Sequence, residues 1–137
     1  MKIINNNLID RVVEQAKESP RLRMNYNFHT SLDEKCHRML NALEPGTQVP
    51  IHHHMTKDES FILLRGKVRV NIYNDLGELT ETIVLCHADG NIGVDIPKNT
   101  WHNVECLEEG SVIFEVKEGP FVEHAVDGIL RVYTDLP

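Results

Sequence analysis

Hydrophobic and polar residues change their spacing along the chain near Pro20. Before that residue, apolar residues recur at helical spacing and form one stripe, Leu8, Ile9, Val12, Val13 and Ala16. Asn7 is expected to cap this segment with Asp10 in its first turn, and Ser19-Pro20 ends it. The pattern predicts an α-helix over residues 7–18, which we expect to pack on the outside of the fold or on a second subunit.

After Pro20 the spacing becomes two, which is typical of strands with one apolar face. Residues 21–29 alternate in this way, and further short strands are predicted at residues 36–43, 48–54, 59–65, 67–74, 79–86, 92–97, 101–107, 111–117 and 129–133. Turns rich in Gly, Pro, Asn and Asp separate most of them. Regular short strands indicate an antiparallel sandwich or barrel, and their number suits a jelly roll.

Composition limits the class of protein. A chain of 137 residues is expected to form one domain with a proper core. The formal net charge of −7 argues against a nucleic-acid partner, because such partners need a basic surface. No apolar run approaches the roughly 20 residues that span a bilayer, and no export signal begins the chain, so we expect no membrane contact and a cytoplasmic location.

The three cysteines support the same location. Cys36, Cys86 and Cys106 are widely spaced and lie in apolar, strand-like segments. An odd number of cysteines without Cys-x-x-Cys spacing predicts reduced, packed thiols.

The run His52-His53-His54, followed by Glu59, predicts chemistry at a metal ion. Side chains two apart on a strand point the same way, so His52 and His54 can address one point while His53 faces away. A turn at residues 55–58 would bring Glu59 back to that point. Two imidazoles and a carboxylate form a site for one divalent transition metal with open coordination positions.

The spacing around this run resembles the first motif of the cupin superfamily, at Gly46, His52, His54, Glu59 and Gly66. The second cupin motif has a counterpart in Gly90, Pro97, Asn99 and His102. Gly90 lies one residue too far from Pro97, Asn99 replaces a turn glycine, and Cys106 stands where the family has Asn. Asn can adopt the left-handed conformation that such a turn needs. The resemblance implies that His102 is the fourth metal ligand.

The resemblance can be narrowed to the WbuC-type cupin-fold metalloproteins, through residues 19–29, 38–46, 96–102 and 114–120. It implies an all-β fold, the cupin double-stranded β-helix or jelly-roll barrel, with an N-terminal α-helix. Residues 1–33 would form a helix and strand arm on the barrel, and residues 34–137 the metal-binding domain. The family also implies a link to O-antigen or other surface-polysaccharide synthesis, and cupins commonly form homodimers.

Three imidazoles and one carboxylate suit Fe, Mn, Ni, Co or Zn. An octahedral ion would keep two positions for water or substrate, which favours Fe or Mn if the protein is an enzyme. Zn or Ni can dominate in recombinant protein.

A second group of residues has two interpretations. The polar face of residues 21–29 carries Arg21, Arg23, Asn25, Asn27 and His29, and Arg38 can join it. One interpretation is the solvated side of an edge strand. The other is a row at the barrel mouth that binds a small anionic or polyhydroxylated ligand, since guanidinium groups suit carboxylate or phosphate and amides suit sugar hydroxyls.

Three functions follow from these residues and the resemblance. The first is a metal-dependent isomerase or epimerase acting on a sugar or nucleotide sugar in surface-polysaccharide (lipopolysaccharide) synthesis. The second is an Fe(II)-dependent dioxygenase, and the third is a non-catalytic, metal-dependent sugar-binding or sensing module. No residue can be assigned as a general base from the sequence.

Overall fold

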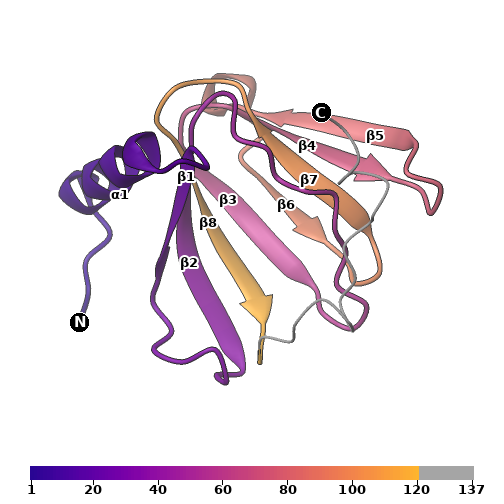
Figure 1. Cartoon of the computed structure of the whole chain (residues 1–137), viewed down its shortest axis with the longest axis horizontal. Helices are drawn as coiled ribbons and strands as arrows, with labels where there is room; N and C mark the ends of the chain where they lie inside the picture. The colour runs from indigo at the N-terminus through magenta and orange to yellow at the C-terminus, as the bar shows by residue number, and fades with distance from the viewer. Residues whose placement is uncertain (121–137) are drawn as a thin grey trace.

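The computed structural model describes residues 1–120 of the chain. Within these residues, one α-helix precedes a series of antiparallel strands (Figure 1). The elements are α1 (Asn6–Glu18), β1 (Arg23–Asn27), β2 (Cys36–Leu43), β3 (Glu59–Arg65), β4 (Val68–Tyr73), β5 (Leu79–Leu85), the 3-10 turn η1 (His87–Asp89), β6 (Gly93–Ile96), β7 (Trp101–Cys106) and β8 (Ser111–Glu118).

The helix is capped by Asn5, not by the predicted Asn7. Asn5 has an extended backbone, and its side chain accepts a hydrogen bond of 3.0 Å from the backbone N–H of Leu8. The helix therefore begins one residue before the predicted range, and Asp10 lies beyond its first turn. Its far end is Ser19, whose N–H bonds the carbonyl of Gln15. The predicted apolar stripe is buried.

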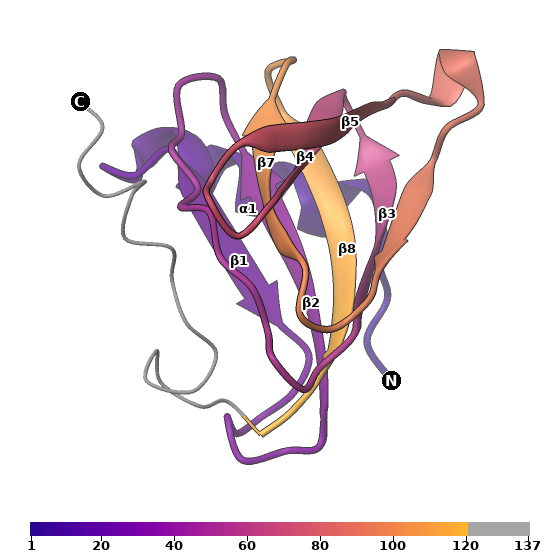
Figure 2. The same ribbon diagram turned by 90° about the vertical axis from the view of Figure 1, so that its right-hand side faces the viewer.

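The strands form two sheets, one in the order β1-β2-β8-β3-β6 and the other in the order β5-β4-β7. The sheets lie on opposite sides of a shared apolar interior, as two views at 90° show (Figures 1 and 2). Neighbours distant in sequence pair closely, for example β2 with β8 and β4 with β7. This arrangement confirms the all-β jelly roll with an N-terminal helix.

The core has two parts on either side of the larger sheet. The interior cluster draws on both sheets through Leu43, Phe61, Leu63, Val68, Val70, Leu85, Ile96, Val104 and Ile113. The second cluster joins the helical stripe to Leu40, Ala42 and Val112 on the outer face. The helix therefore packs outside the sandwich, in agreement with one of the two predicted positions.

Two predicted strands differ from the structure. Residues 48–54 form no strand, and only His52 makes an isolated bridge, to His102. Pro50 lies in the middle of this segment and has no N–H to donate to a sheet. The alternation over residues 21–29 yields a strand only at Arg23–Asn27, because Leu22 has a left-handed φ of 56°. The predicted strand at residues 129–133 lies outside the described residues.

The cysteines are free thiols, as predicted, but they are not all packed. Cys36 is exposed, whereas Cys86 and Cys106 are half-buried. Cys106 Sγ lies 3.1 Å from the carbonyl oxygen of Leu43. Among the described residues, none of the helices is long and apolar enough to cross a membrane.

Candidate metal centre

Backbone pairing brings His52 and His102 together. The N–H of each residue donates to the carbonyl of the other, at 3.0 and 2.9 Å, although His52 belongs to no strand. The two ring centroids are 4.4 Å apart. An isolated bridge to the start of β7 therefore positions His52, in place of the strand alternation that the sequence suggested.

Both rings are oriented by a carbonyl two residues earlier in the chain. Nδ1 of His52 lies 2.9 Å from the Pro50 oxygen, and Nδ1 of His102 lies 2.7 Å from the Thr100 oxygen. A carbonyl only accepts, so each Nδ1 carries the proton and donates it there. In the neutral ring the lone pair is then on Nε2, which is the atom a metal would bind.

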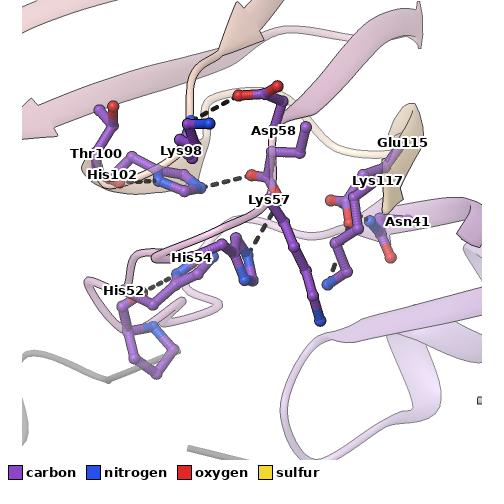
Figure 3. Close-up of polar contacts among 12 residues, drawn as sticks. Asn41, His52, His54, Lys57, Asp58, Lys98, Thr100, His102, Glu115 and Lys117 are labelled. Carbon is purple, nitrogen blue, oxygen red and sulfur yellow. Dashed lines mark hydrogen bonds and ion pairs between the residues drawn. The ribbon is translucent and has the colours of Figure 1, made fainter. Parts of the chain in front are cut away.

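Glu59, the first residue of β3, connects two imidazoles. Its Oε1 is 2.5 Å from His102 Nε2, and its Oε2 is 3.2 Å from His54 Nε2. Figure 3 shows His54 and His102 directed toward this shared region. Glu59 is 4% exposed, so the contacts are shielded from water.

A turn between β6 and β7 ties the two sequence motifs together. Asn99 adopts the left-handed conformation with φ 62°, as predicted for this position. Its N–H donates to the carbonyl of His54 at 2.7 Å, and the N–H of Lys98 donates to Asp58 Oδ1 at 2.8 Å. Asn99 therefore fixes His54 relative to His102.

The four side chains fit a single divalent ion. His52, His54, Glu59 and His102 each offer one ligand atom, and these atoms all lie within 4.8 Å of one another. Ligands at about 2.1 Å from a metal are at most about 4.2 Å apart, so binding requires at most a contraction of about half an ångström. We call these four residues the His–Glu cluster.

His53 lies outside the cluster. Its ring stacks on Trp101 at a centroid distance of 3.6 Å. The Trp101 indole N–H donates to Asp75 at 3.2 Å, which places both rings in a packing contact beside the site.

Burial and mutual contact set the protonation states of the cluster. Burial, reinforced by the nearby His102, lowers the pKa of His52 to about 4, so its ring is neutral at pH 7. Burial alone would raise the pKa of Glu59, but hydrogen bonds from His102 and His54 outweigh it and lower that pKa well below its ordinary value. Burial would lower the pKa of His102, but its hydrogen bond to Glu59 outweighs burial and raises that pKa, so a cation would have to replace the proton on its Nε2. The cluster thus combines a carboxylate with the neutral imidazole of His52.

A cavity of about 210 Å³ adjoins the cluster. Its walls include His52, Glu59 and His102, and they continue to Arg21, Arg23, Met24, Asn25, Asn41, Ala42, Leu43, Val49, Phe61, Val104, Ile113 and Glu115. The cavity wall therefore combines residues of the predicted metal site with arginines of the predicted ligand-binding row.

Only part of the predicted ligand-binding row lines the cavity in the structure. Arg21, Arg23 and Asn25 line the cavity, and Arg23 is held there by a hydrogen bond of 2.9 Å from its Nη1 to the Gln48 carbonyl. Asn27, His29 and Arg38 are not among the residues that line it. His29 is buried and stacks on His37 at a centroid distance of 4.1 Å, so the row is not a uniformly solvated face.

The sequence did not single out Glu115, which also lines the cavity. It lies on β8 opposite Phe61 of β3, and its Oε1 accepts a hydrogen bond of 3.1 Å from the Asn41 amide. Glu115 lies two residues after buried Ile113, and side chains two apart on a strand share one face, so the sequence could have placed Glu115 on the inner face of β8. Sequence alone does not reveal that this face of β8 looks into the same cavity as the histidines.

Comparison with known proteins gives a family match for the sequence. A family model described as "Domain of unknown function (DUF6016)" matches residues 4–85, a range that contains His52, His54 and Glu59. None of the curated proteins matches the sequence.

Three solved structures illustrate the likeness. KdgF from Halomonas sp. is 16% identical, with a TM-score of 0.57, over 77% of this chain and 85% of that one. The cupin domain of Cnp3 from Schizosaccharomyces pombe is 11% identical, with a TM-score of 0.55, over 71% and 60%. CapF from Staphylococcus aureus, described as a capsular polysaccharide assembling protein, is 23% identical, with a TM-score of 0.59, over 80% and 31%. The chain thus spans under a third of CapF. These likenesses show the fold, a cupin jelly-roll barrel.

Proposed function

The chain belongs to the family described as a domain of unknown function, DUF6016, and we propose that it binds one divalent metal and acts on a sugar. The observation that carries the proposal is the convergence of four side chains, of which all but His54 line a cavity: His52, His54, Glu59 and His102. Ionisable side chains that are buried together need a common ligand or close mutual hydrogen bonds.

The cavity supports a small polar ligand. Its volume of about 210 Å³ is below the range of about 300 to 1,000 Å³ for drug-sized ligands, which favours a single sugar unit over a whole nucleotide sugar. Any nucleotide group would lie outside the cavity. Arg21, Arg23 and Asn25 supply cationic and amide donors for a carboxylate, a phosphate or hydroxyls.

A role in surface-polysaccharide synthesis forms part of the proposal. Its support is the sequence resemblance to the WbuC-type metalloproteins, together with the fold shared with a capsular polysaccharide assembling protein.

The chemistry we propose is isomerisation or epimerisation. A divalent ion in the His–Glu cluster would polarise a carbonyl or hydroxyl oxygen of the sugar. Arg23 would orient the anionic or hydroxylated end, and the apolar wall formed by Phe61 and Val104 would limit the water around the reacting atoms.

Calorimetry with metal-loaded protein tests the proposal. Hexoses, hexose phosphates and hexuronates would be titrated into protein loaded with Fe(II), Mn(II), Ni(II) or Zn(II), and into chelated protein. We expect at least one probe to bind only when metal is present. Equal binding to loaded and chelated protein, or no binding to any form, would contradict a metal-dependent sugar site.

The same samples separate the alternative reaction classes. NMR of the bound sugar would show interconversion if the protein is an isomerase or epimerase. Oxygen consumption by the Fe(II)-loaded protein with sugar would instead indicate a dioxygenase. Binding without turnover under any metal would indicate a binding or sensing module.

A further inference from the structure

Glu115 is a second carboxylate in the cavity, separate from the proposed metal ligands. In the β3–β8 register, Glu59 is opposite Lys117 and Phe61 is opposite Glu115. The two glutamates are therefore neighbours on the inner face of adjacent strands. The Glu115 side chain is 13% exposed and borders the same cavity as His52, Glu59 and His102.

Two polar groups hold this carboxylate in place. The Asn41 amide donates to its Oε1 at 3.1 Å, and the ammonium of Lys117 lies 3.8 Å from its Oε2. Figure 3 shows Glu115, Lys117 and Asn41 grouped on one side of the region toward which His54 and His102 point. The ammonium is farther away than in a close ion pair, so Oε2 remains available to a ligand in the cavity.

The surroundings of Glu115 control how readily its carboxylate takes up a proton. Burial raises the pKa of Glu115 to about 7, and the nearby charge of Glu59 adds to the increase. Lys117, His102 and the Asn41 hydrogen bond act in the opposite direction. A cation in the His–Glu cluster would lower this pKa and favour the carboxylate, the form that can accept a proton from a ligand in the cavity and then return it.

We propose that Glu115 is the acid–base residue of this site, taking a proton from a sugar held between it and the His–Glu cluster and returning it to the product. This role rests on the proposed function. It supplies the general base that no sequence pattern identified.

The step is balanced for an aldose–ketose conversion. The Glu115 carboxylate accepts the proton of the C–H bond next to the carbonyl, and the electron pair of that bond forms the carbon–carbon double bond of an enediolate. Glu115 then delivers the proton to the neighbouring carbon while the hydroxyl proton moves to the other oxygen. The composition of the sugar is unchanged, and no oxidant or reductant is needed.

Glu115→Gln provides the test, since glutamine keeps the size of the side chain and an oxygen for the Asn41 amide. Metal-loaded wild type and variant would be incubated in D2O with aldohexoses, ketohexoses and hexuronates, and loss of C–H signals would be followed by NMR. The control is Glu109→Gln, because Glu109 is a 77% exposed carboxylate remote from the cavity. We expect wild-type exchange, the same rate in Glu109→Gln, and a rate at least ~100-fold lower in Glu115→Gln.

Metal content of each sample makes the outcomes distinct. Undiminished exchange in Glu115→Gln with full metal would overturn the role of Glu115 and leave the proposed function intact. Loss of metal from Glu115→Gln would also overturn it, by assigning the residue to metal retention. Absence of exchange in the wild type with every probe would overturn the proposed isomerase function and the acid–base role with it.

Discussion

At the scale of single residues, the orientation of the imidazoles matters most for the proposed metal site. Pro50 and Thr100 accept from the Nδ1 atoms of His52 and His102, so both rings are fixed before any ion arrives. A preorganised ligand loses little side-chain entropy on binding. Arg23, at another part of the cavity wall, is also held by a backbone carbonyl, because its guanidinium donates a hydrogen bond to the carbonyl of Gln48.

Replacing Arg23 by Ala should weaken the binding of an anionic sugar and leave metal content unchanged. A charge-assisted hydrogen bond contributes about 1.5 to 3 kcal/mol, which corresponds to a loss of roughly 10- to 100-fold in affinity. Calorimetry with a hexose phosphate or hexuronate measures the effect. Arg38→Ala serves as the control, because Arg38 does not line the cavity. Equal affinities of wild type and Arg23→Ala for the sugar would show that Arg23 does not bind it.

Glu115 should leave a signature in the pH dependence of stability. Its pKa in the folded protein is about 7, above the ordinary value of 4.5, so between these pH values the folded protein holds a proton that the unfolded chain releases. The resulting stabilisation is present below pH 4.5 and is lost as the pH rises through 7.

Urea unfolding of wild type and Glu115→Gln, both with chelator present, measures this effect between pH 4.5 and 8. The wild type should lose stability relative to the variant as the pH rises across that window. A difference in free energy of unfolding that stays constant with pH would show that the Glu115 pKa is not raised.

At the scale of elements, the helix and the segment around His52 show what local pattern can predict. The apolar stripe located the helix, and the strands Cys36–Leu43 and Glu59–Arg65 match the predicted ranges, because each is a short run rich in apolar residues that stops at a turn signal. Residues 48–54 look equally strand-like, yet their backbone pairing is limited to the bridge between His52 and His102. Pairing between distant segments has no local signature.

Local sequence spacing likewise explains which residues of the candidate site could be predicted. His52, His54 and Glu59 could be selected because they lie close together in sequence with a distinctive spacing, and His102 followed from family resemblance. Glu115 has no such neighbours in sequence. Its place beside the cluster depends on the β3–β8 register, which only the folded chain defines.

The helix cap gives a prediction at this scale. Asn5→Ala removes the acceptor for the Leu8 N–H and should lower the free energy of unfolding by about 1 kcal/mol. Asn7→Ala is the matched control, since Asn7 is exposed within the helix and Ala favours helix there. Chemical denaturation measures both. A larger loss for Asn7→Ala than for Asn5→Ala would contradict the assigned cap.

At the scale of the whole molecule, two sheets close around an interior that is apolar except beside the His–Glu cluster. The outer helix covers one face of the larger sheet and leaves the cavity side clear. On the smaller sheet, strand β5 is an edge strand with exposed Leu79 and Ile83. Such an edge is compatible with the homodimer, which stays a prediction.

Elemental analysis of purified protein tests the central claim most directly, namely that His52, His54, Glu59 and His102 together bind one divalent metal. The account predicts about one ion per wild-type chain and per His53→Ala chain, almost none in His54→Ala or His102→Ala, and lower thermal stability in these two variants. Full metal occupancy in His54→Ala and His102→Ala would contradict it.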